Sequence, residues 1–130
     1  MKWTSLLADP KGIEGVYGGD VPDLRGVSLH DIELSREGPA LNLRFDMPSF
    51  PRRPPTKWTT QGFNTVQVTL SLTGLGTISF NGFTSNPLAD ISLHPQDGIT
   101  LEISSTAVQL RATADMAYIR RLSAYALAAD

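Results

Sequence analysis

The sequence predicts a mainly β protein, an antiparallel β-sandwich or open barrel of about eight strands with a short N-terminal helical or turn segment. Two observations support this fold class. Apolar and polar residues alternate in many short stretches that recur roughly every 8–12 residues. Turn-forming residues separate these stretches, since the 130-residue chain contains 11 glycines and 9 prolines. A chain of this length fits one domain, so we expect residues 1–130 to fold as a single unit.

Composition argues against several classes of function. The formal net charge is −2, whereas a general nucleic-acid binder needs a surplus of Lys and Arg to neutralise phosphates. The chain has no cysteine, so disulfides and thiolate chemistry are absent. No apolar stretch approaches the roughly 20 residues of a membrane-spanning helix, and the N-terminus lacks the apolar run of a signal peptide. We therefore expect a cytoplasmic protein that binds neither nucleic acid nor membranes.

Residues 1–23 are expected to form a short helix that covers one end of the core. Asp9 and Pro10 form a helix-start signal, with Asp9 as the N-cap and Pro10 at the first helical position. Glycines destabilise a helix interior, so the helix should be short. They stand at Gly12, Gly15, Gly18 and Gly19.

Residues 26–46 predict a β-hairpin. The apolar parity changes at His30 and Asp31, which indicates a β-bulge there. Residues 36–39 (Arg-Glu-Gly-Pro) predict the turn. On the returning strand, apolar residues alternate with Asn42, Arg44 and Asp46.

The longest strict alternation runs from Gly62 to Phe83. Its inward positions are Val66, Val68, Leu70 and Leu72. The opposite face is almost entirely Thr, Ser and Gln, and we expect it to meet water. Residues 74–76 (Gly-Leu-Gly) predict a reversal, and Ile78 and Phe80 restart the alternation. This stretch therefore predicts a second antiparallel hairpin.

The C-terminal third predicts further strands near residues 91–93, 99–103 and 106–114. Residues 115–127 leave helix and strand open. Asp115 is a suitable helix cap and the alanines favour a helix. We favour a short turn and then a closing strand around Leu122 to Tyr125.

Residues 47–61 form the least regular segment. Its four prolines forbid an inner strand, because proline lacks the amide donor of a β-ladder, and they favour an extended or polyproline-like loop. The segment carries an aromatic and basic cluster of a kind enriched at protein interfaces. The partner-binding candidates here are Phe50, Arg52, Arg53, Lys57 and Trp58. The competing interpretation is that Trp58 and Phe50 cover the core as an intramolecular lid.

A second group of candidates is acidic. Asp31 and Glu33 share one strand face, and Asp46 lies on the returning strand. Three interpretations compete: a solvated acidic face, a patch that binds a basic partner, and a carboxylate pair for glycoside hydrolysis. The only histidines, His30 and His94, are distant in sequence. Two such histidines without cysteine indicate neither a zinc site nor a hydrolytic triad. We expect no catalytic residues, no metal and no cofactor.

Several short segments stand in an order that resembles one known family. They are Trp3, Val16-Tyr17-Gly18, Pro22-Asp23-Leu24, Val27-Ser28-Leu29-His30, Leu41-Asn42-Leu43-Arg44-Phe45-Asp46, Pro54-Pro55-Thr56-Lys57-Trp58, Asn64-Thr65-Val66-Gln67-Val68 and Leu122-Ser123-Ala124-Tyr125. Over nearly its whole length the chain resembles the immunity protein 50 family of bacterial polymorphic-toxin systems. This resemblance implies a cytosolic antidote, not an enzyme, that binds a cognate toxin domain and blocks it.

The residues leave two alternatives to an immunity protein. One is a small-ligand or carbohydrate-binding β module, with Trp58, Phe50 and Phe63 as stacking platforms. The other is a hydrolase that uses the three carboxylates named above. A homodimer, the binding face and the toxin's activity are left open.

Overall fold

The computed structural model describes residues 2–85 and 87–128, and it is mainly β. The eight strands are β1 (Val27–Ser35), β2 (Ala40–Asp46), β3 (Thr65–Thr73), β4 (Ile78–Asn81), β5 (Leu88–His94), β6 (Ile99–Ser104), β7 (Gln109–Ala114) and β8 (Met116–Tyr125). The helical elements are the 3-10 turn η1 (Trp3–Leu6), α1 (Lys11–Tyr17) and α2 (Thr56–Thr60). The predicted fold class is confirmed.

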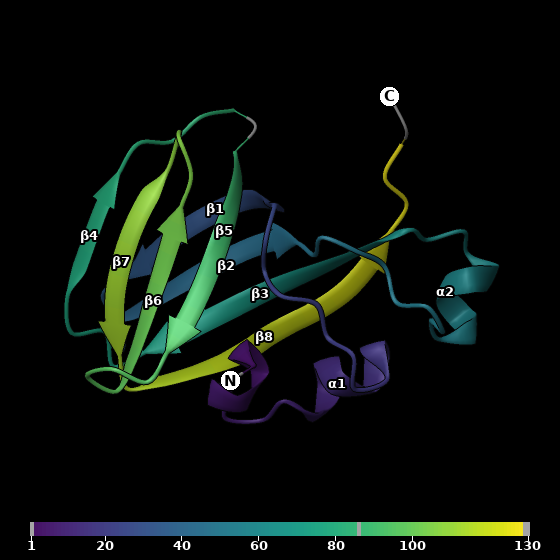
Figure 1. Cartoon of the computed structure of the whole chain (residues 1–130), viewed down its shortest axis with the longest axis horizontal. Coiled ribbons are helices and arrows are strands. Elements are labelled where there is room, and N and C mark those ends of the chain that lie inside the picture. Colours follow the sequence, from purple (N-terminus) through teal and green to yellow (C-terminus); the bar gives the residue numbers. More distant parts are fainter. Residues whose placement is uncertain (1, 86, 129–130) are drawn as a thin grey trace.

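The strands form one antiparallel sheet in the order β4-β7-β6-β5-β1-β2-β3-β8. The sheet has two parts, which we call the first half-sheet (β1, β2, β3 and β8) and the second half-sheet (β4, β5, β6 and β7). Among the described residues, two ladder pairs join them, between the starts of β1 and β5. The halves fold over one another, with their strands crossing (Figure 1). This arrangement turns one face of each half-sheet inward.

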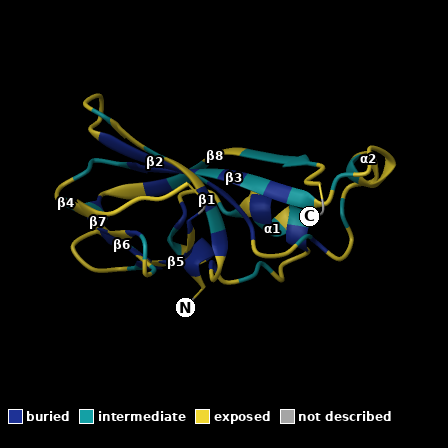
Figure 2. Cartoon of the chain, turned by 90° about the horizontal axis from the view of Figure 1, so that it is seen from above, coloured by how far each residue is buried: buried dark blue, intermediate teal, exposed yellow. Residues whose placement is uncertain are grey.

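The core lies between the two half-sheets. Alternation on β2 and β3 sends one residue in two inward, and these side chains are almost fully buried. They are Leu41, Leu43, Phe45, Val66, Val68, Leu70 and Leu72. The second half-sheet contributes Leu101, Ile103, Leu110 and Ala112. Burial is concentrated on the strands, whereas the loops and α2 are largely exposed (Figure 2).

The predicted hairpin between β3 and β4 is wrong. β3 pairs with β2 on one side and with β8 on the other, and β4 instead pairs with β7 at the far edge of the sheet. Residues 74–76 cross from the first half-sheet to the second. The Leu75 amide donates to the carbonyl of Pro39, in the turn before β2 (3.1 Å), and the Gly76 amide donates to the carbonyl of Thr113 on β7 (2.8 Å). β2 and β8 are both longer than β4 and occupy the two edges of β3. No edge of β3 is therefore left to pair with β4.

The hairpin of β1 and β2 is confirmed, with its bulge and its turn. Leu29 pairs with Phe45 and Asp31 pairs with Arg44, so His30 is the extra residue of the bulge. The strand favoured for the C-terminus is also confirmed, because β8 extends over ten residues along the open edge of β3. An edge that offers unpaired amides and carbonyls favours a strand over a solvent-exposed helix.

The N-terminal segment forms the predicted short helix. α1 begins one residue later than expected, with Pro10 in the N-cap position, although Asp9 Oδ1 accepts the Lys11 amide at 3.1 Å. The helix ends at Gly18, whose φ of 64° is left-handed and suits glycine. Ile13 and Tyr17 pack into the core cluster, so α1 covers one side of it.

The segment 47–61 is not extended throughout, which corrects the predicted polyproline-like loop. Its prolines end at Pro55, and the following five residues form α2. This short helix projects beyond the ends of the strands (Figure 1). We call residues 47–61 the arm. No helix in the described part of the chain is long and apolar enough to cross a membrane.

Candidate functional site

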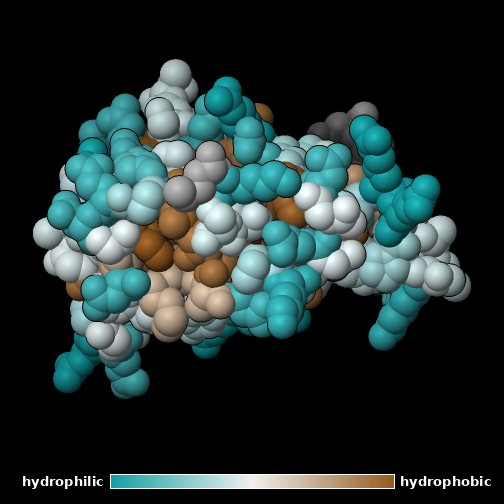
Figure 3. All heavy atoms as spheres, turned by 60° about the horizontal axis from the view of Figure 1, so that its bottom comes forward, coloured by the Kyte–Doolittle hydropathy of each residue, from teal (hydrophilic) through white to brown (hydrophobic). Residues whose placement is uncertain are grey.

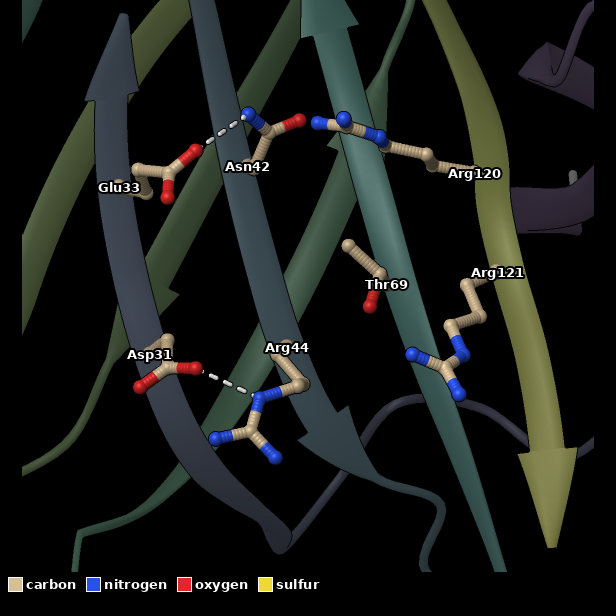
Figure 4. A pocket seen from close by; sticks show the side chains of 7 residues that line it. All are labelled: Asp31, Glu33, Asn42, Arg44, Thr69, Arg120 and Arg121. Carbon is tan, nitrogen blue, oxygen red and sulfur yellow. Dashed lines mark hydrogen bonds and ion pairs between the residues drawn. The ribbon is translucent and has the colours of Figure 1, made fainter.

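The outward side of the first half-sheet, here called the outer face, carries most of the polar candidates. On β2 the alternation that buries Leu43 and Phe45 turns Asn42, Arg44 and Asp46 outward. A depression of about 360 Å³ lies on this face (Figure 4). It is lined by Asp31, Glu33, Asn42, Arg44, Thr69, Arg120 and Arg121.

Two β-bulges increase the charge density of the outer face. In β1 the extra residue is His30, as described above. In β8, Thr69 pairs with Arg121 and Leu70 with Ile119, so Arg120 has no partner on β3. A bulge shifts the alternation by one residue. Arg120 and Arg121 therefore both extend over the outer face, although they are neighbours in sequence (Figure 4).

Asp46 is the centre of a hydrogen-bond network across all four strands. Its side chain is only 7% exposed, and its Oδ2 lies 2.9 Å from His30 Nε2. The Tyr125 hydroxyl donates to Oδ2 at 2.5 Å and Gln67 Nε2 donates to Oδ1 at 3.1 Å. Burial, and then the bond to Asp46, raises the pKa of Tyr125 to about 12. A buried carboxylate needs such partners, since burying an unpaired charge is costly.

Asp31 and Arg44 form an exposed ion pair beside this network. Arg44 Nε donates to Asp31 Oδ2 at 2.6 Å, and Arg44 Nη1 donates to Gln67 Oε1 at 3.2 Å. The bond from Arg44 holds the pKa of Asp31 below its ordinary value. The Asp31 carboxylate is thereby neutralised within the protein.

Asn42 lies buried in the floor of the depression with one atom unsatisfied. Its Nδ2 donates to Glu33 Oε1 at 3.2 Å. Its Oδ1 is buried and accepts no hydrogen bond from any described residue. Buried polar atoms without partners are rare in folded proteins.

The arm carries the aromatic and basic candidates. The rings of Phe50 and Trp58 have centroids 6.1 Å apart and planes inclined by 42°, and both side chains pack partly against the core. The lid interpretation is therefore correct in part. Arg52, Arg53 and Lys57 are exposed and form no ion pair within residues 2–85 and 87–128. The end of the molecule that carries the arm is hydrophilic, and apolar surface gathers over the opposite half (Figure 3).

The sequence placed Asp31 and Glu33 on one strand face and Asp46 on the neighbouring strand, and the structure changes their roles. Asp31 and Glu33 are on the outer face with Asp46, but Asp46 is buried and all three carboxylates already accept bonds from neighbouring side chains. The face is one of mixed charge, because Arg44, Arg120 and Arg121 line it too. No group of three or more His, Asp or Glu in the described part of the chain is arranged to hold a metal ion.

Sequence reasoning missed five residues of the depression. Asn42 and Arg44 could have been included, because they alternate in step with Asp46. Thr69 was expected to face water, but its place between two arginines was not foreseen. The bulge at Arg120 left no signal in the sequence, so the pair Arg120 and Arg121 could not be assigned to one face.

The comparison with known families decides which family this is. The model of the family described as Immunity protein 50 matches residues 9–125, nearly the whole chain. The chain belongs to the immunity protein 50 family. The matched span contains the arm and the complete outer face of this immunity protein 50 member, including Arg120 and Arg121. No curated protein and no solved structure matches the chain.

Proposed function

We propose that this protein binds a cognate toxin domain and neutralises it by occupying its surface, without catalysis. The observation that carries the proposal is membership of the immunity protein 50 family over residues 9–125. In this proposal the protein acts in the bacterial cytoplasm as the antidote of a polymorphic-toxin system.

The first half-sheet supports a docking role because many bonds across its strands hold its surface in place. Asp46 links side chains from β1, β3 and β8. The four strands of the half-sheet also share long antiparallel ladders. A surface that is already ordered loses little conformational entropy when a partner binds. Rigid strands also hold interface side chains more accurately than loops do.

The arm supplies a second candidate contact. Tyr17 donates a hydrogen bond to the Ser49 carbonyl at 2.7 Å, which holds the start of the arm against α1. Beyond it, Arg52, Arg53 and Lys57 are exposed, and Trp58 is partly buried. Arg and Trp are the residue types that most often anchor protein interfaces.

Co-expression with the toxin domain encoded beside this chain tests the proposal. We expect the two proteins to elute together in gel filtration, and cells that carry the antidote to survive the toxin. As a control, an immunity protein of similar size that belongs to a different toxin should not protect the cells. A toxin that kills equally with and without this chain would count against the proposed function.

A further inference from the structure

Arg120 and Arg121 hold two guanidinium groups over the outer face without a carboxylate to bind. Neither forms an ion pair with any residue in 2–85 or 87–128. Their heads lie on either side of Thr69, and both extend from β8 toward β2 and β3 (Figure 4). A guanidinium is a planar fork of donors that matches a carboxylate. The pair therefore offers a place for a carboxylate above Thr69.

Asn42 Oδ1 is a second and independent sign of an absent partner. Asn42 is 7% exposed, and this oxygen has no hydrogen bond within the described chain. It points from β2 toward the side of the depression where Arg120 lies (Figure 4). An N–H or O–H group of a bound partner would satisfy it.

The carboxylates of the depression lie on the side away from β8. Asp31 is paired with Arg44, and Glu33, which keeps its negative charge, stands on β1 and accepts the amide of Asn42. The side of the depression nearest β8 is therefore locally positive, although the net charge of the chain is −2. At physiological salt, charges farther apart than about 8 Å are largely screened, so the local arginines decide what binds here.

We propose that this depression is where the toxin docks, through an acidic segment. An Asp or Glu carboxylate of that segment binds Arg120 and Arg121 above Thr69, and a neighbouring N–H or O–H donates to Asn42 Oδ1. The inference rests on the proposed function and names its surface and the chemistry of the partner. It places the central contact on the rigid first half-sheet and leaves the arm at the margin.

The first test reverses the charge of the pair. We expect Arg120→Glu with Arg121→Glu to weaken binding of the neighbouring toxin domain roughly 100-fold, since reversal replaces two attractions by repulsions. The matched control is Arg25→Glu with Arg36→Glu, which makes the same change of net charge at exposed positions outside the depression. The control should retain wild-type affinity within about threefold. All four positions are exposed, so melting temperatures should not change.

The second test removes the unsatisfied oxygen. Asn42→Leu keeps a similar volume and deletes Oδ1, so we expect toxin affinity to fall about tenfold while the melting temperature is equal to or above that of the wild type. A residue that served only the fold would show the opposite pattern, with a lower melting temperature and unchanged affinity.

The outcomes separate this inference from the proposed function. If the wild type binds the toxin and the Arg120/Arg121 variant binds equally well, the docking surface is wrong and the function stands. If the wild type itself does not bind, both are overturned. A charge swap tests the contact directly. If replacing an acidic residue of the toxin with Lys restores its binding to the Arg120/Arg121 variant, the carboxylate contact is established.

Discussion

The two faces of the first half-sheet are made by the same strands and have opposite characters. The inner face is apolar and closed, with Leu43, Phe45 and Val68 at 0% exposure. The outer face also contains buried groups, Asn42 and Asp46, but these are polar and joined by directional bonds. The inner face leaves no polar side chain to satisfy, whereas on the outer face the Asn42 oxygen and the two arginines have no partner among residues 2–85 and 87–128. This difference indicates that the inner face specifies the fold and the outer face is available for recognition.

The energies of the two faces should also differ. Burying a Val or Leu side chain is worth about 1.5–3 kcal/mol, and each hydrogen bond has a net value of about 0.5–1.5 kcal/mol. Substitutions on the inner face should therefore unfold the protein, substitutions of exposed residues on the outer face should mainly change binding, and the buried Asp46 should lie between the two.

The largest effect should come from a charge on the inner face. Val68→Asp buries an unpaired carboxylate, and we expect it to cost more than about 4 kcal/mol, enough to prevent cooperative folding. Its neighbour provides the control, because Thr69→Asp places the same carboxylate among the arginines of the outer face and should cost less than about 1 kcal/mol. Thermal melts followed by circular dichroism measure both. A Val68→Asp variant that melts cooperatively would contradict the assigned core.

A smaller effect should come from the buried centre of the outer face. In Asp46→Ala the His30 imidazole, the Gln67 amide and the Tyr125 hydroxyl lose the carboxylate that they contact. We therefore expect the free energy of unfolding to fall by about 2–3 kcal/mol. The exposed ion pair is the matched contrast, since Asp31→Ala should cost about 0.5 kcal/mol. Urea denaturation gives both values. Equal losses would show that the network around Asp46 adds nothing beyond a surface pair.

The arm provides a comparison with the outer face in binding. Arg52→Glu with Arg53→Glu should leave stability unchanged and weaken toxin binding about tenfold, because the proposed interface has these side chains at its margin. Titration calorimetry with the toxin domain measures the change. A loss larger than that of the Arg120/Arg121 variant would move the centre of the interface to the arm, and no loss would exclude the arm from it.

The smallest effect concerns the titration of Tyr125. Its folded pKa is raised from 10.0 to about 12, so its stabilising contribution is complete below pH 10 and is lost as the pH rises toward 12. We expect Asp46→Asn to lower this pKa, although not to 10.0, because burial remains the larger cause. The phenolate absorbance that is lost in Tyr125→Phe identifies the residue. An unchanged pKa in Asp46→Asn would mean that the carboxylate does not influence Tyr125.

Local pattern was most informative where one face of a strand had to be apolar. The alternation in Leu41 to Asp46 and in Val66 to Leu72 predicted both strands and their inward residues, because a period of two separates a core face from a solvent face. The bulge at His30 was also visible, since it changes the parity of apolar residues. The outward Ser71 was expected to meet water but is buried at 2% exposure, because Asn42 and Tyr118 of the neighbouring strands flank it.

The candidate site was predicted only in part. Asp31 and Glu33 were placed on one strand face with Asp46 on the neighbouring strand, but hydrogen-bond partners of Asp46 come from strands farther away in sequence. Tyr125, for example, is 79 residues from Asp46. Such contacts depend on which strands are neighbours, and a single sequence does not encode that order in any local pattern.

The sequence by itself determined the fold class, the inward residues of most strands and, through its resemblance, the family. Only the tertiary structure decided that β3 pairs with β8 instead of β4, that Asp46 is buried, and that Arg120 and Arg121 share the face of Asn42. The physical reason is that alternation is a local property of each strand, whereas strand order and bulges arise from the competition of all the strands for the same ladder edges.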